Sequence, residues 1–193
     1  MGRGHGGSRG GGAGGGVSMG RTEAGHSQAL AKGVIGVEKE IRNRDIEYAF
    51  AFDDSGNVVY SEKGYKDHVN LDARQIKDRV VTHNHPDGWD SPGLSGADMR
   101  AVVQGDMKEF RAVTANKTFS IKRPEKGWGK APGVVTRKYN DAVKKQVLSD
   151  REFLRGYKGD IAMARRRLDN TFYHRVTKTV ATSFGWDYTY KTG

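Results

Sequence analysis

The chain has 193 residues, carries a formal net charge of +10 and contains no cysteine. This length allows one domain with its own hydrophobic core, together with a tail or a small appendage. Because cysteine is absent, disulfide bonds and thiolate metal ligands are excluded, and any metal site must use imidazole and carboxylate groups.

Residues 1–25 contain long runs of glycine, which offer almost no apolar surface to offset the entropy of ordering the backbone. We predict a disordered tail or linker there. RNA contact through Arg3, Arg9 and Arg21 is the alternative. The chain has no run of about 18 apolar residues and no apolar signal segment at its start, so we expect a cytoplasmic, intracellular protein without a membrane partner.

The segment from His26 to about residue 133 alternates between helical and strand patterns. Apolar residues at helical spacing from Leu30 to Ile41 predict a first helix. Two β-prone runs, 46–52 and 57–62, flank turn-forming residues and predict a hairpin. A further strand is predicted at 79–85, where Pro86 ends it.

Ser95 is a good N-cap residue and predicts a helix over 96–105, followed by β-prone runs at 110–114 and 118–121. This order of elements favours an α/β (α+β) fold with a mixed sheet flanked by helices, rather than a bundle or a sandwich. We therefore predict one such domain over 26–133.

Residues 134–193 are predicted to form a basic helical extension, with Gly156 and Gly159 separating two amphipathic runs. The extension has 13 basic and 6 acidic residues, whereas 26–133 has 17 and 16. Its cationic and aromatic side chains include Arg155, Lys158, Arg165, Arg166, Arg167, Arg175, Lys178, Tyr157, Tyr173, Trp186 and Tyr188. A solvated helical face that packs on the domain or a partner is the favoured interpretation, and nucleic-acid binding is the alternative.

His83 and His85 lie two residues apart in the predicted strand, so both imidazoles project from the same face. Such a pair can present two ligands to one metal ion. Packed or surface histidines are the more usual explanation of the pattern, so the pair alone is weak evidence.

The segment Ser95-Gly96-Ala97-Asp98 places a hydroxyl at the predicted N-cap and a carboxylate three residues later. The simpler interpretation is a capping arrangement in which Asp98 is favoured by the helix dipole. A capping pair is also held rigidly, as a metal ligand and an oxyanion donor require. Both interpretations can hold at once.

Together, Thr82-His83-Asn84-His85-Pro86 and Ser95-Gly96-Ala97-Asp98 resemble the His-x-His-Pro…Ser-x-x-Asp signature of the JAMM zinc metalloproteases, the active JAB/MPN domains. The His-Asn-His-Pro form is most similar to bacterial and phage members, including the RadC-like branch and JAB domains attached to toxin and phage head proteins. The resemblance covers residues 26–124 and implies a cytidine deaminase-like layering. The loop between the two motifs is longer than usual and carries Trp89, a candidate substrate contact.

The resemblance implies a zinc ion held by His83, His85 and Asp98, and a hydroxyl of Ser95 that bonds the water or the oxyanion. It also implies an upstream glutamate as general base. Glu47, at the start of a predicted strand, is the best match, with Glu38 and Glu40 as the alternatives.

These roles describe a zinc-dependent metallopeptidase or isopeptidase acting on a polypeptide, such as an isopeptide-linked or ubiquitin-like one. Two other classes stay open. One is a non-catalytic JAB-like module that assembles with a larger toxin-associated protein or virion. The other is a RadC-like nucleic-acid-associated protein that uses the basic helices.

Overall fold

The computed structural model describes residues 23–86 and 93–192. Residues 1–22, which make up most of the predicted tail, and Trp89 lie outside the described residues. The first helix, α1 (Glu23–Ile41), begins three residues before His26, the predicted start of the domain, and so includes the last residues of the predicted tail.

Six strands form one mixed sheet in the order β2-β1-β3-β4-β5-β6. They are β1 (Tyr48–Phe52), β2 (Val58–Lys63), β3 (Val80–Asn84), β4 (Glu109–Thr114), β5 (Lys117–Lys122) and β6 (Asp187–Thr192). Strands β3 and β4 are parallel, and the other neighbouring pairs are antiparallel. The prediction of an α/β fold with a mixed sheet flanked by helices is confirmed.

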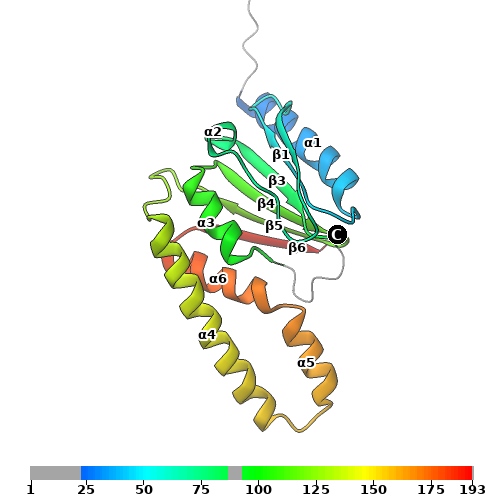
Figure 1. The fold of residues 1–193 in the computed structure, drawn as a ribbon, viewed down its shortest axis with the longest axis vertical. Coiled ribbons are helices and arrows are strands. Elements are labelled where there is room, and N and C mark those ends of the chain that lie inside the picture. The colour runs from blue at the N-terminus through cyan, green and yellow to red at the C-terminus, as the bar shows by residue number, and fades with distance from the viewer. Residues whose placement is uncertain (1–22, 87–92, 193) are drawn as a thin grey trace, which may run out of the picture.

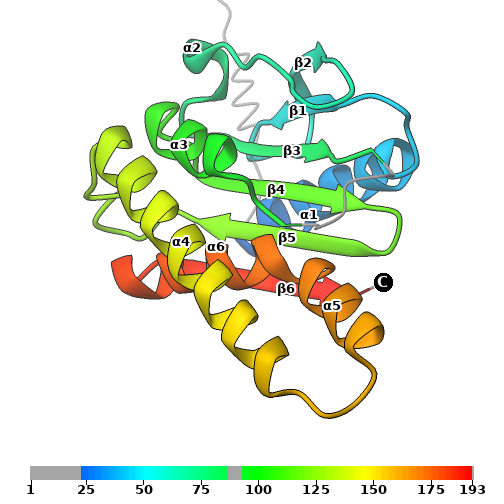
Figure 2. The same cartoon turned by 60° about the horizontal axis from the view of Figure 1, so that its bottom comes forward.

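Helices cover both faces of the sheet (Figures 1 and 2). Helix α1 packs on one face, where Val34 contacts Phe52 and Val80. The other face carries α3 (Gly96–Gln104), α4 (Pro132–Gly156) and α6 (Phe172–Phe184). The larger core lies between these three helices and the central strands, and includes Met99, Val102, Val135, Tyr139, Val176, Val180, Val81, Phe110, Ala112 and Phe119. A short helix, α2 (Ala73–Ile76), precedes β3.

The end of the chain differs from the predicted helical extension. Helix α6 ends at Gly185, whose φ of 70° is the left-handed conformation that closes many helices. The chain then forms β6, which pairs with β5 along its length. The sequence pattern missed this strand because Tyr188 and Tyr190 alternate with polar residues over only six positions. The C-terminal segment therefore completes the same sheet and the same core as the preceding residues.

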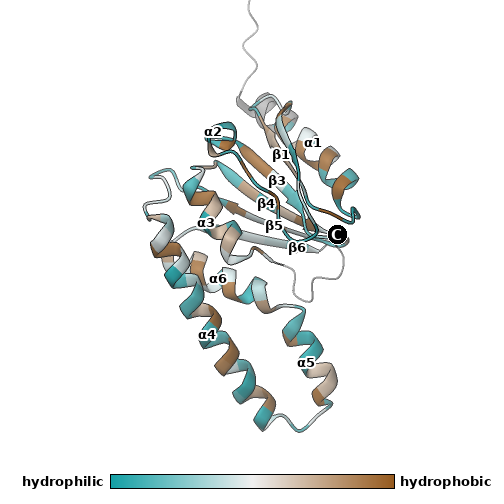
Figure 3. Ribbon diagram, viewed as in Figure 1, coloured by the Kyte–Doolittle hydropathy of each residue, from teal (hydrophilic) through white to brown (hydrophobic). Residues whose placement is uncertain are grey.

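The outer half of α4 and helix α5 (Ile161–Asp169) project away from the sheet (Figure 3). Apolar side chains on this projection are at least half exposed, namely Leu148, Phe153, Ile161 and Met163. The side chains of Arg165, Arg166 and Arg167 are also exposed there. Among the described helices, none combines the length and the apolar character needed to cross a membrane.

Candidate metal centre

Strand β3 brings both motif histidines to the face of the sheet that α3 covers. All five of its residues are buried, and side chains along it alternate between the two faces. His83 and His85 therefore share one face, while Thr82 bonds to Glu38 of α1 on the opposite face. The register of β1 with β3 pairs Ala49 with His83.

His83 is oriented by its surroundings. Its Nδ1 lies 2.8 Å from the carbonyl oxygen of Arg111, which can only accept a hydrogen bond. Nδ1 therefore carries the proton, and Nε2 keeps a lone pair. The ring also stacks on Phe110, with 4.7 Å between ring centroids and 17° between the planes. A backbone carbonyl that fixes the tautomer of a histidine is a common second partner of metal-binding imidazoles.

Three potential ligand side chains converge in front of β3. The Nε2 atoms of His83 and His85 lie 2.8 Å apart, and each lies 3.5 Å from a different carboxylate oxygen of Asp98. A tetrahedral ion with bonds of about 2.0–2.1 Å separates its ligand atoms by about 3.3 Å. The two distances to Asp98, which involve different carboxylate oxygens, are close to this value, whereas the two imidazole nitrogens lie closer together than it. These residues fit a metal ion that accepts nitrogen and oxygen ligands.

Asp98 is held in place by the start of α3. The Ser95 hydroxyl accepts a hydrogen bond from the Asp98 N–H at 3.1 Å, and the Asp98 carboxylate accepts one from the Ser95 N–H at 2.7 Å. This is the capping arrangement expected from the sequence. The capping bond uses the Ser95 Oγ as an acceptor and leaves its own O–H available as a donor.

The two C-terminal helices fix the residue before this cap. Tyr139 of α4 and Thr177 of α6 both donate hydrogen bonds to the carbonyl oxygen of Leu94, at 2.9 and 2.8 Å. All three residues are buried. The sequence pattern did not identify Tyr139 and Thr177 as supporting residues, because they are distant from Leu94 in the sequence and lie in ordinary amphipathic helices. The C-terminal segment thus helps to place Ser95 and Asp98.

Glu47 is the upstream glutamate that the structure brings to this centre. It immediately precedes β1, and continuing the β1–β3 register places it opposite His85 on the same face. It is 4% exposed. Burial raises the pKa of Glu47 from 4.5 to about 7; the charge of His85 opposes this rise and that of Asp98 reinforces it. A carboxylate with a pKa near neutrality can both take up and release a proton at physiological pH.

The two alternative glutamates lie elsewhere. Glu38 lies on the buried side of α1, where its carboxylate accepts hydrogen bonds from Thr82 and from the guanidinium of Arg111. Glu40 is exposed on α1. Neither lines the cavity at the histidines. The tertiary structure therefore separates three candidates that the sequence left open.

Burial and Asp98 together determine the charges of the centre. Burial lowers the pKa of His83 to about 4, against the opposing effect of Asp98. Burial also disfavours the charged form of His85, but the hydrogen bond and charge of Asp98 outweigh it and raise the pKa of His85. Burial opposes ionisation of Asp98, yet the two histidines hold its pKa far below the usual value. As the pH falls, His85 therefore takes up a proton well before His83 does.

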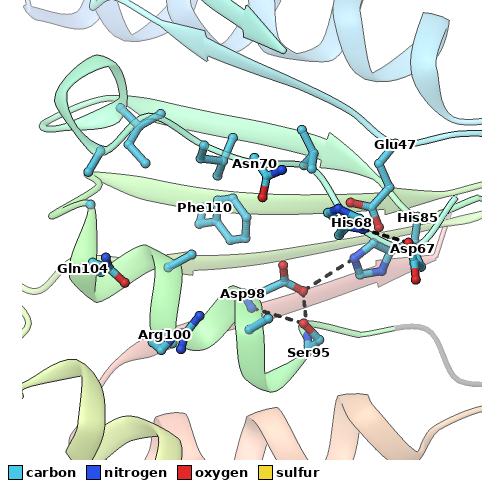
Figure 4. A pocket seen from close by; sticks show the side chains of 17 residues that line it. Glu47, Asp67, His68, Asn70, His85, Ser95, Asp98, Arg100, Gln104 and Phe110 are labelled. Carbon is cyan, nitrogen blue, oxygen red and sulfur yellow. Dashed lines mark hydrogen bonds and ion pairs between the residues drawn. The ribbon is translucent and has the colours of Figure 1, made fainter. Parts of the chain in front are cut away.

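A cavity of about 390 Å³ opens beside the centre. Figure 4 shows it as a trough with Glu47, His85, Ser95 and Asp98 at one end and Gln104 of α3 at the other. One wall is α3, the other is the segment 67–76, and Phe110 lies on the floor. This volume lies within the usual range of ligand pockets in proteins, about 300–1,000 Å³.

His68 lines this cavity but is not part of the ligand cluster. Its Nδ1 is 2.8 Å from the Asp67 carboxylate, and its ring stacks on Tyr65. The side chain of His68 is 53% exposed. Trp89, the predicted substrate contact, lies outside the described residues.

Comparisons with protein-family models, with curated proteins and with solved structures found no match to this chain. The JAMM resemblance therefore depends on the two motifs themselves.

Proposed function

We propose that the protein is a zinc-dependent peptidase or isopeptidase that hydrolyses an amide bond. The observation that carries this proposal is the convergence of His83, His85 and Asp98 beside a buried Glu47, at one end of a cavity. The two imidazoles and one carboxylate are a ligand set typical of catalytic zinc sites, which keep a fourth position for water or substrate. The motif resemblance to JAMM metalloproteases supports the same assignment.

Zinc bound by this ligand set acts as a Lewis acid that lowers the pKa of a water molecule towards neutrality. The residues of the chain then divide the remaining work. Glu47 takes a proton from the attacking water and delivers it to the leaving amine, which its pKa of about 7 allows. The Ser95 hydroxyl donates to the substrate carbonyl oxygen as negative charge develops there.

The cavity supports a polypeptide as the substrate. Its walls combine small or aliphatic side chains from α3 and from the segment 67–76 with polar groups, which are Asp67, His68 and Asn70 on one wall and Arg100 and Gln104 on the α3 wall. We propose that an extended segment of the substrate lies along this trough, with its scissile bond at the Glu47 end.

The test measures zinc content and peptide hydrolysis of the full chain. We expect close to one zinc ion per chain in the wild type and loss of zinc in the double variant His83→Ala/His85→Ala. The matched control is His68→Ala, which removes a histidine from the same cavity and should keep the zinc. Full zinc retention in the double variant would refute the ligand assignment.

Glu47→Gln tests the catalytic role separately from metal binding. It should retain zinc and lose about 10²–10⁴-fold in hydrolysis of a peptide library, since it removes a general base. Glu40→Gln, an exposed glutamate on α1, is the control and should have wild-type activity. Unchanged hydrolysis in Glu47→Gln would remove this residue from the mechanism.

A further inference from the structure

Asn84 lies between the two histidines in sequence, on the opposite face of β3, and is completely buried. In the structure its side-chain amide leaves β3 and contacts the chain on both sides of Glu47. A buried polar side chain between two ligands requires partners, and these partners identify what it does.

The ladder between β1 and β3 changes character at this point. Paired residues run from Phe52 with Val80 to Ala49 with His83, where the register ends. Beyond it, the Tyr48 N–H donates to the Oδ1 of Asn84 at 2.8 Å, in place of a backbone acceptor on β3. The side chain of Asn84 thus continues the hydrogen bonding of the ladder for one more residue.

The hydrogen bonds of the Asn84 side chain to the backbone on both sides of Glu47 are called the bracket below, and the amide nitrogen supplies its second half. Its Nδ2 donates to the carbonyl oxygen of Ile46 at 2.9 Å and to that of Arg44 at 3.4 Å. The residue before Glu47 and the residue after it are therefore bonded to one side chain. Because Tyr48 N–H can only donate and the Ile46 carbonyl can only accept, these partners also fix which amide atom is oxygen.

The backbone of Glu47 is held from the other side by the chain that follows β2. The Glu47 N–H donates to the carbonyl of Tyr65 at 2.7 Å, and its own carbonyl accepts from the Gly64 N–H at 2.8 Å. With Asn84 on one side and residues 64–65 on the other, the backbone on which Glu47 is mounted is bonded in both directions across the sheet.

We infer that Asn84 is a positioning residue that holds the carboxylate of Glu47 opposite His85, and so couples the general base to the ligand strand. This inference rests on the proposed function. His83 and Asn84 are the last two residues of β3 and His85 follows them directly, so any shift of this part of the chain moves the metal ligands and the anchor of Glu47 together.

The chemistry of the bracket requires an asparagine. One atom of the side chain must accept from an N–H, and another must donate to a carbonyl, at the reach of a single Cγ. Aspartate supplies the acceptor but no donor when ionised, and serine has a shorter reach. The residue between the histidines is therefore determined by the segment carrying the base rather than by the metal.

Amide hydrogen exchange tests the bracket without reference to activity. In Asn84→Ala the Tyr48 N–H loses its acceptor, and we expect its exchange to accelerate about fivefold or more relative to the wild type. The control is Thr82→Val, which removes a buried hydrogen bond from the same strand on the α1 face and leaves Asn84 in place. Equal protection of Tyr48 in the wild type and in Asn84→Ala would overturn the inference.

Kinetics test the consequence for Glu47. Zinc-loaded Asn84→Ala should retain one zinc ion per chain and a KM within about twofold of wild type, while kcat falls by about 10²-fold, as expected when a catalytic group is misplaced. Thr82→Val should keep its kcat. A loss of zinc together with kcat, or an unchanged kcat, would show that Asn84 does not act through Glu47.

Asn84→Asp provides a second variant if Asn84→Ala does not fold. It keeps the acceptor for Tyr48 and loses the donor to Ile46, so Tyr48 should remain protected while kcat still falls. Rapid Tyr48 exchange in this variant would contradict the bracket. Absence of any hydrolysis by the zinc-loaded wild type would instead refute the proposed function, and Tyr48 exchange would still decide whether Asn84 holds this segment.

Discussion

Ionisable groups lie on both faces of the sheet around β3, but their charges are compensated in different ways on the two faces. On the α1 face, Arg111 pairs with Glu38 and Glu109 at 2.6–2.7 Å, and Thr82 and Ser120 complete the network. On the α3 face, Glu47 and Asp98 lie beside two histidines. Within the described residues, no ion pair joins a lysine or arginine to Asp98 or Glu47. On the first face the carboxylates are paired with cations of the protein, Arg111 and, at 3.9 Å from Glu109, Lys122, whereas the second face has the composition of a site for a metal cation.

The largest expected effect is on the α1 face. Arg111→Met leaves the buried Glu38 without a cation and the partly buried Glu109 with only Lys122, 3.9 Å away, so the free energy of unfolding should fall by about 3–5 kcal/mol. Denaturant unfolding measures this change. Arg74→Ala, which breaks an exposed pair with Asp72, is the control and should cost less than about 1 kcal/mol. A small effect of Arg111→Met would mean that this face is not a structural network.

Zinc should stabilise the folded protein only through the ligands on the α3 face. Free zinc at about 100 times its Kd should raise the free energy of unfolding of the wild type by about 2.7 kcal/mol, since the ligand set forms only in the folded state. Thermal unfolding with and without zinc measures this gain. Arg74→Ala should respond like the wild type, whereas His83→Ala/His85→Ala should gain nothing. An equal gain in the double variant would place the zinc elsewhere.

The pH dependence of zinc binding should show the titration of one imidazole. The pKa of His85 is raised above 6.5, so a proton competes with zinc once the pH falls below that raised value. The pKa of His83 is about 4, so His83 does not compete in the same range. Between about pH 5 and the pKa of His85, zinc affinity should therefore fall about tenfold per unit decrease in pH. Calorimetric titration at several pH values measures this slope, and a slope of two protons would contradict it.

The smallest expected effect tests the support that the C-terminal helices give to the α3 face. Tyr139→Phe removes the hydrogen bond to the carbonyl of Leu94 and should lower the free energy of unfolding by about 1 kcal/mol. Zinc affinity should fall slightly, because Asp98 follows Leu94 closely along the chain. Tyr157→Phe, on the exposed projection, should change neither quantity. Identical zinc affinity in Tyr139→Phe would limit this hydrogen bond to a structural role.

Local patterns predicted the elements that carry the motifs. Alternation in β3 places His83 and His85 on one face whatever the surrounding fold, because side chains of a strand alternate. Ser95 and Asp98 form the expected cap, since that interaction spans only three residues. Strand β6 was not predicted, because its short alternation gains its stability from pairing with β5.

The nucleic-acid and assembly roles of the basic C-terminal segment stay predictions. Its positive charge is a property of composition, and charge alone does not identify a partner. The structure separates this segment into a part that completes the sheet, α6 and β6, and a projecting part that carries Arg165, Arg166 and Arg167.

The sequence by itself determined the chemical groups of the centre and their local spacing: two imidazoles along one strand, and a carboxylate in the first turn of a helix. Only the tertiary structure decided that Glu47 rather than Glu38 joins them, and that Asn84, Tyr139 and Thr177 hold the surrounding backbone. The physical reason is the sequence separation over which each interaction acts. Alternation and capping act within a few residues, whereas the position of Glu47 depends on how β1 pairs with β3 and on which face α1 covers.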